Sequence, residues 1–270
     1  MRHLTVIIVL SIGLIIASSL PGYAELKWID LPISSGGTVK ALLGIPQGIV
    51  KAPSVVYSHG TAVRRLGYDG AKTQGYDIVD FVKFLNSTNY VVLAPVRDQG
   101  ILLEPFNFKL GAVGHETTSS IQDGIEQGIA SLQAAVTFLR NHATATGKVG
   151  TIGFSEGGLV TTWAMLDGLD VDAVVLMSPA TIKKADRLNM KNATQSKTFK
   201  NIKAPVLITL GKKDNPAILK GTKRLLIPAL KNAGVLLKTK LEYPGDHRWF
   251  WRVRTEYFPD VLEFLNEHLN

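Results

Sequence analysis

The sequence predicts an α/β fold in which a mostly parallel sheet carries helices on both faces. Two observations indicate this fold. Short apolar segments typical of buried strands alternate with longer amphipathic segments, and polar residues suited to chemistry follow the ends of those strands. Active sites of such sheets lie at the carboxyl ends of the strands. Residues 25–270 are enough for a single domain of this kind with a sizeable core.

Strands are expected where apolar, often β-branched runs end at turn residues. They span residues 38–45, 54–58, 90–94, 148–154, 171–177, 205–210 and 235–243. Helices are expected where apolar residues recur at helical spacing, over 76–85, 121–141, the segment after Ser155, and 249–269. Pro259 predicts a break in the last helix. Residues 181–203 lie between two strands and are expected to form a small cap over the site.

The segment Gly153-Phe154-Ser155-Glu156-Gly157 has the G-x-S-x-G spacing of a nucleophile elbow. The glycines are needed because side chains at those positions would collide with the preceding strand or the following helix. Ser155 is therefore the candidate nucleophile, and the backbone N–H of Glu156 is a candidate donor to an oxyanion. The alternative is a glycine-rich, phosphate-binding turn of a nucleotide-binding fold.

A serine nucleophile needs a base, and two histidines follow Ser155 in the chain. His268 stands in the last turn of the terminal helix, where a cation suits the helix dipole and solvent. His247 stands in a loop after the last strand, from which its ring can reach the carboxyl edge of the sheet. His247 is therefore the predicted base.

The base in turn needs a carboxylate that fixes its tautomer. Asp214 is predicted to supply it, because it follows a buried strand and lies between the nucleophile and the base in sequence. Asp246 adjoins His247, so its side chain is expected to point elsewhere, and Asp172 opens a strand at the wrong end of the sheet. These two acids are the alternatives.

A second oxyanion donor is expected from the loop after the 54–58 strand, where His59-Gly60-Thr61 stands. Gly60 allows the backbone to turn, and the predicted donor is the N–H of Thr61, with Ala62 as the second choice.

These segments together resemble the α/β-hydrolases, and more narrowly the dienelactone hydrolase-like and prolyl oligopeptidase-like serine hydrolases. The segments are the His59-Gly60 strand end, the elbow, the Gly211–Asp214 strand end and Gly245-Asp246-His247. The resemblance covers about residues 30–269 and implies cofactor-free hydrolysis of a small-molecule ester, or a related acyl bond, through an acyl-enzyme. The chain departs from dienelactone hydrolases, whose nucleophile is a cysteine, and from prolyl oligopeptidases, which carry a large propeller.

Other functions are compatible with the same residues. A peptidase or an acyltransferase could use the same triad, and a non-enzymatic envelope protein could keep the fold to bind a ligand. The chain contains no cysteine, which excludes a thiol nucleophile and a thiolate metal site. His115-Glu116 lacks a second histidine at metal-binding spacing, so no metal is expected.

Residues 1–24 have the pattern of a signal peptide. Arg2 and His3 precede an apolar run over 4–17, and Gly22-Tyr23-Ala24 offers small residues before a cleavage site. The run is shorter than the ~20 apolar residues of a membrane span. We therefore expect export to the periplasm or the medium, with no stable span after cleavage. An uncleaved N-terminal anchor is the alternative.

Positive charge is concentrated in residues 181–240, which contain 15 Lys and Arg residues against two Asp residues. The whole chain has a net charge of +8. A solvated face of helices and loops accounts for this more simply than a charged partner does. No aromatic residues are interleaved with the basic ones in the manner of nucleic-acid binders, so no nucleic acid partner is expected.

Overall fold

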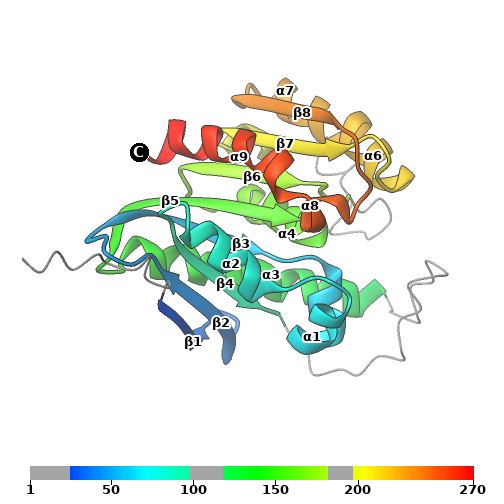
Figure 1. Cartoon of the computed structure of the whole chain (residues 1–270). Coiled ribbons are helices and arrows are strands. Elements are labelled where there is room, and N and C mark those ends of the chain that lie inside the picture. The colour runs from blue at the N-terminus through cyan, green and yellow to red at the C-terminus, as the bar shows by residue number, and fades with distance from the viewer. Residues whose placement is uncertain (1–24, 98–117, 182–196) are drawn as a thin grey trace, which may run out of the picture.

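A computed structural model describes residues 25–97, 118–181 and 197–270 (Figure 1). The strands of this part form one eight-stranded sheet in the order β1-β2-β4-β3-β5-β6-β7-β8. Strand β2 runs antiparallel to both β1 and β4, whereas neighbouring strands from β4 through β8 are parallel. The predicted mostly parallel sheet with helices on both faces is confirmed.

The strands are β1 (Glu25–Pro32), β2 (Thr38–Ile45), β3 (Ala52–Ser58), β4 (Val91–Val96), β5 (Ala145–Phe154), β6 (Ala173–Met177), β7 (Val206–Gly211) and β8 (Leu237–Tyr243). The helices are α1 (Thr61–Thr73), α2 (Ile78–Asn86), α3 (Thr118–Arg140), α4 (Glu156–Leu166), α6 (Pro216–Gly221), α7 (Ile227–Asn232), α8 (Trp249–Arg252) and α9 (Arg254–Leu269). A 3₁₀ segment, η1 (Lys197–Asn201), precedes β7, and a π-helical segment, η2 (Thr222–Leu226), joins α6 to α7.

Two apolar cores lie on opposite faces of the sheet. Helices cover both of these faces (Figure 1). On one face α3, α4 and α7 pack against the strands, with Ile125, Leu159 and Leu230 among the buried residues. On the other face α1, α2, α8 and α9 cover the sheet, with Phe81 and Phe258 buried. Burial on both faces explains the continuous apolar runs of β3, β5, β6 and β7, and it brings the carboxyl ends of these strands to one edge.

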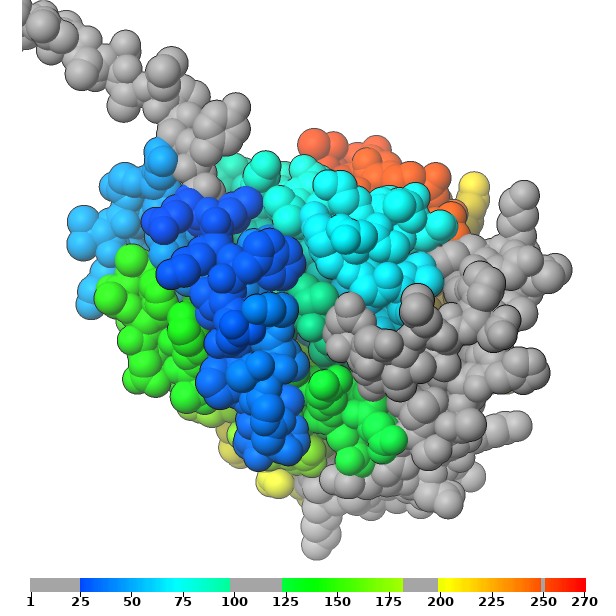
Figure 2. Space-filling view, turned by 90° about the horizontal axis from the view of Figure 1, so that it is seen from below, coloured from blue at the N-terminus to red at the C-terminus, as the bar shows by residue number. Residues whose placement is uncertain are grey.

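Two elements near the N-terminus were absent from the sequence prediction. Strand β1 pairs with β2 from Glu25↔Ile45 to Pro32↔Thr38, and most of its side chains are not buried, so it lacks an alternating apolar pattern. Figure 2 shows β1 and β2 on the surface of the molecule, beside α1 and α3. The predicted loop after Ser58 is short, because α1 begins at Thr61. This helix is kinked at Gly67, where φ is 67°.

The predicted break at Pro259 is wrong, because Pro259 lies inside α9 and the break falls at Val253. Val253 has non-helical angles (φ −130°, ψ 54°) and separates α8 from α9. Pro259 removes only one backbone hydrogen bond near the start of a long helix. The neighbouring Phe258 and Val261 are buried against the sheet and hold the helix together.

The predicted leader lies outside the described residues. So do His115 and most of the predicted cap at 181–203. At the end of that cap segment, the buried Phe199 of η1 packs into the core. No helix in the described part of the chain is long and apolar enough to cross a membrane.

Candidate active site

Ser155 stands at a sharp turn between β5 and α4, with φ 55° and ψ −116°. Such a positive φ is strained for a residue with a side chain, and it recurs at functional turns. A Cβ on Gly153 would lie 2.6 Å from the carbonyl oxygen of Gly157, and one on Gly157 would lie 1.9 Å from that of Ser58. Both glycines are therefore required by close backbone contacts, as the elbow motif predicts.

The structure brings Ser155, His247 and Asp214 into one hydrogen-bonded chain. His247 Nε2 lies 2.9 Å from Ser155 Oγ, and His247 Nδ1 lies 2.9 Å from Asp214 Oδ1. The three residues follow β5, β8 and β7, whose carboxyl ends meet at one edge of the sheet. With the proton on Nδ1, the imidazole donates to the carboxylate and accepts from the serine hydroxyl. This is the arrangement that activates a nucleophile.

The Asp214 carboxylate is buried, and three donors hold it. In addition to His247, the Asn215 N–H donates to Oδ1 at 2.6 Å, and the Ser178 hydroxyl donates to Oδ2 at 2.5 Å. Ser178 follows β6, the neighbour of β7, and is itself fully buried. Sequence reasoning missed Ser178. The available signal was its position. Ser178 follows β6, and β6 is the neighbour of β7, the strand that precedes Asp214.

An aromatic ring packs against one face of the His247 imidazole. The Phe154 ring stacks on the His247 imidazole with centroids 4.9 Å apart and an angle of 28° between the planes. Trp251 packs edge-on against Phe154 at 5.8 Å. The residue at the variable second position of the elbow motif therefore contacts the His247 ring in this chain.

The alternative residues named from the sequence lie away from this hydrogen-bonded chain. Asp172 accepts from the Val149 N–H and pairs with Lys148 at the opposite end of β5. Asp246 accepts from the Arg248 N–H and pairs with Arg252. His268 lies in the last turn of α9.

The two predicted oxyanion donors are each the first residue of a helix, Thr61 of α1 and Glu156 of α4. The first N–H groups of a helix have no acceptor within the helix and lie at the positive end of its dipole. The two helix starts are close together. A Cβ on Gly60 would lie 3.3 Å from Ser155 Cβ, and Gly157 packs on the backbone of Ser58 and His59. This placement suits an oxyanion site beside Ser155.

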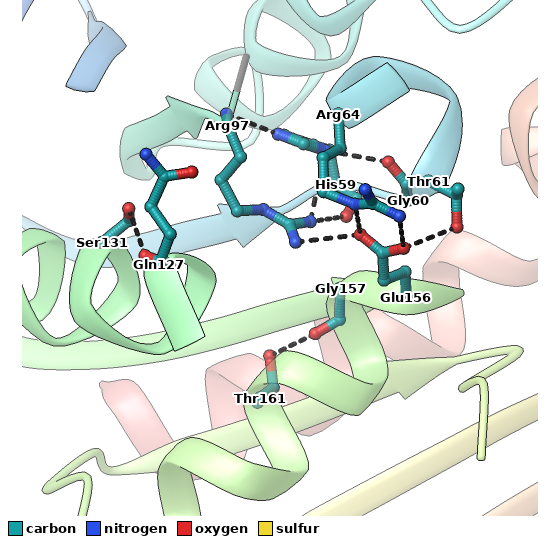
Figure 3. Close-up of polar contacts among 10 residues, drawn as sticks. All are labelled: His59, Gly60, Thr61, Arg64, Arg97, Gln127, Ser131, Glu156, Gly157 and Thr161. Carbon is teal, nitrogen blue, oxygen red and sulfur yellow. Dashed lines mark hydrogen bonds and ion pairs between the residues drawn. The ribbon is translucent and has the colours of Figure 1, made fainter. Parts of the chain in front are cut away.

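A cluster of buried charges lies directly behind these helix starts, and the sequence did not predict it (Figure 3). Glu156 is 5% exposed, and its carboxylate accepts hydrogen bonds from Arg64, Arg97 and Thr61. Burial alone raises the pKa of Glu156. The hydrogen bonds and charges of the two arginines, with the Thr61 hydroxyl, outweigh burial, so the net pKa lies below the usual range. Glu156 is therefore ionised in the folded protein at neutral pH.

His59 completes the cluster as a neutral imidazole. Its Nε2 accepts from the Arg97 backbone N–H at 2.9 Å, which places the proton on Nδ1, 2.9 Å from the Gly60 carbonyl oxygen. The Arg97 side chain also donates to the His59 carbonyl oxygen. Burial and the nearby Arg97 charge lower the pKa of His59 well below its usual range. His59 thus links β3 to the end of β4 and has a structural role.

Among the described residues, no group of three or more His, Cys, Asp or Glu side chains is placed to hold a metal ion.

The model of the dienelactone hydrolase family matches residues 77–260, which is more than half of the chain. The chain belongs to the dienelactone hydrolase family. As a member of this family, the chain is a hydrolase. The matched residues include Ser155, Asp214 and His247. A search of curated proteins finds no match to this chain.

Solved structures share the fold at low sequence identity. A Klebsiella pneumoniae subsp. pneumoniae MGH 78578 protein, provisionally assigned as a dienelactone hydrolase, has a TM-score of 0.66 and 17% identity, with 92% of this chain and 100% of that chain covered. The Pyrococcus furiosus esterase Pf2001 has a TM-score of 0.63 and 19% identity, covering 92% and 94%. The Pyrococcus horikoshii acylaminoacyl peptidase has a TM-score of 0.63 and 17% identity, but the match spans 92% of this chain and only 42% of the peptidase.

The neutral, buried His59 predicts a loss of stability in mild acid. The unfolded chain binds a proton at His59 below about pH 6.5, whereas the folded protein resists protonation until a lower pH. Above about pH 6.5, His59 is therefore neutral in both the folded and the unfolded state, and its titration does not lower the free energy of unfolding. As the pH falls toward the folded pKa, the free energy of unfolding decreases by up to about 1.4 kcal/mol per pH unit.

The measurement is urea unfolding between pH 4.5 and 8 of the wild type and of His59→Gln, whose amide can accept from Arg97 but does not titrate. The variant should lack this part of the pH dependence. Parallel pH profiles for the two proteins would contradict the assignment of a neutral His59.

Proposed function

We propose that this protein is a serine hydrolase that cleaves a carboxylic ester through an acyl-enzyme. The observation that carries the proposal is the chain of two 2.9 Å contacts from Ser155 through His247 to Asp214. The proposed nucleophile is a serine. The chain departs here from true dienelactone hydrolases, whose nucleophile is a cysteine, because it contains no cysteine. The proposed substrate is a small-molecule ester, supported by the fold shared with the Pyrococcus furiosus esterase Pf2001 over 94% of that chain.

In the proposed reaction, Ser155 Oγ attacks the ester carbonyl carbon while His247 Nε2 takes the hydroxyl proton. Asp214 holds the imidazole through Nδ1 and stabilises its protonated form. The backbone N–H groups of Thr61 and Glu156 bind the oxyanion of the tetrahedral intermediate. His247 then protonates the departing alcohol, and a water molecule, activated by the same histidine, hydrolyses the acyl-enzyme.

Ser155 is the first residue to test. A fluorophosphonate should label the protein on Ser155, and turnover of p-nitrophenyl acetate should fall by several orders of magnitude in Ser155→Ala, because the nucleophile is removed. Peptide mapping identifies the labelled residue, and circular dichroism checks that the variant is folded. Labelling of a folded Ser155→Ala protein would reject this nucleophile, and a wild type that neither labels nor turns over esters or aminoacyl amides would favour a ligand-binding protein.

Asp214 and Asp246 offer a matched pair of substitutions. Asp214→Asn should lower kcat by about 10,000-fold, because the amide no longer selects the active tautomer of His247. Asp246→Asn changes a neighbouring acid whose partners are exposed, and it should alter kcat by less than about fivefold, the equivalent of ~1 kcal/mol. A reversed order of the two effects would move the orienting acid to Asp246.

We also propose that residues 1–24 direct export and are removed. The support is the sequence pattern of a basic start, an apolar run over 4–17 and small residues before position 25. Cleavage after Ala24 would keep the pairing of Glu25 with Ile45. Expressed with its own leader in a bacterium, the protein should be found outside the cytoplasm and should start at Glu25. N-terminal sequencing and fractionation test this, with a protein lacking residues 2–24 as the cytoplasmic control. Soluble cytoplasmic protein starting at Met1 would contradict export, and full-length protein in the membrane fraction would indicate an anchor.

A further inference from the structure

The side chains of Thr61 and Glu156 are hydrogen-bonded to each other (Figure 3). Thr61 Oγ1 donates to Glu156 Oε2 at 2.9 Å. The backbone N–H groups of the same two residues are the oxyanion donors of the proposed mechanism. One side-chain contact therefore joins the two backbone segments whose separation sets the width of the oxyanion hole.

The first turn of α1 holds the carboxylate at a second point. Arg64 lies three residues after Thr61 and donates to Glu156 from Nε at 2.7 Å and from Nη2 at 2.8 Å. This bidentate pair fixes the orientation of the carboxylate as well as its distance. Arg97, directly after β4, donates from Nη1 at 3.2 Å. The carboxylate at the start of α4 is thus tied to α1 and to the end of β4.

Neither backbone chemistry nor stability explains why a carboxylate occupies this position. Any residue except proline at position 156 would supply the backbone N–H. Taking a carboxylate and its arginine partners out of water is expensive, and apolar replacements of such clusters are often as stable. An oxyanion donor, in contrast, must stand within about 2.7–3.1 Å of the oxyanion, so a small change in separation is costly for catalysis.

We propose that Glu156 is the positioning residue of the oxyanion hole. Its carboxylate clamps the first turn of α1 to the first turn of α4 and so holds the Thr61 and Glu156 N–H groups at the separation that the oxyanion requires. This inference rests on the proposed function, because it concerns the same site and the same reaction.

The test compares Thr61→Val, which removes the hydroxyl but keeps the shape, with Thr61→Ser, which retains a hydroxyl. Thr162→Val is the matched control, because it removes another buried threonine hydroxyl, which donates to the Gly158 carbonyl within α4 and does not contact Glu156. Turnover of p-nitrophenyl acetate is normalised to the number of sites labelled by a fluorophosphonate.

A second readout reports on the oxyanion itself. In the presence of an aryl trifluoromethyl ketone, Ser155 Oγ adds to the ketone carbon, the hydroxyl proton passes to His247, and the carbonyl oxygen becomes an oxyanion in the hole. The affinity of this inhibitor therefore follows transition-state stabilisation, whereas KM for the ester includes ground-state binding.

Thr61→Val should lower kcat by about 10- to 100-fold, the size of one hydrogen bond to a charged group, and should weaken the ketone by the same factor. Its KM should change by less than about threefold, since ground-state binding is not affected. Thr61→Ser should restore most of the loss, and Thr162→Val should behave as the wild type. Glu156→Gln should lose at least as much as Thr61→Val, and adding Thr61→Val to Glu156→Gln should cost little more, because both changes loosen one clamp.

The inference is overturned if Thr61→Val keeps the wild-type kcat per labelled site, or if its loss lies in KM alone while ketone affinity is unchanged. It is also overturned if the losses of the two variants multiply. If Glu156→Gln does not fold, the Thr61→Val and Thr61→Ser pair decides the question. A wild type that neither labels nor hydrolyses esters would overturn the proposed function as well, whereas an active wild type with a fully active Thr61→Val would overturn this inference alone.

Discussion

The close approach of two helix starts is the constraint on which the rest of the site depends. The first turn of α4 packs so tightly on the backbone after β3 that position 157 has no room for a Cβ, which would lie 1.9 Å from the Ser58 carbonyl oxygen. That contact sets Ser155 beside Gly60 and places the first N–H groups of α1 and α4 close together. The charge cluster of Glu156, Arg64 and Arg97 lies directly behind these two helix starts.

The site therefore has two supports of different chemistry. On the side of the proposed base, Phe154 and Trp251 provide an apolar wall, and the buried Asp214 accepts hydrogen bonds from Ser178, Asn215 and His247. On the side of the proposed oxyanion hole, the support is ionic, and Arg64 pairs with the Glu156 carboxylate through two hydrogen bonds. Both supports are buried, and donors that are held in place before the reaction need little rearrangement when charge develops.

Local patterns were sufficient to predict the sheet, the elbow and the three residues of the hydrogen-bonded chain. Each of Ser155, Asp214 and His247 follows a strand, so the rule that parallel strands present their carboxyl ends at one edge brought them together. The hydroxyl of Ser178 and the side chains of Arg64 and Arg97 act across strands or between helices, over separations of 36, 92 and 59 residues. No periodicity in sequence reports such contacts. Helix α1 was missed because Gly67 and Gly70 interrupt its pattern, and the Pro259 prediction failed because packing of α9 outweighs the loss of one hydrogen bond.

The position of His247 near the C-terminus has a consequence for the order of assembly. The proposed nucleophile and both helix starts lie within residues 61–156. The proposed base comes after β8, an edge strand that can pair only once β7 is in place. A chain that has folded through β6 has a complete elbow but no base and no orienting acid. In the proposed mechanism, a partly folded chain therefore has no group that could activate Ser155, and activity would first appear when the sheet is complete.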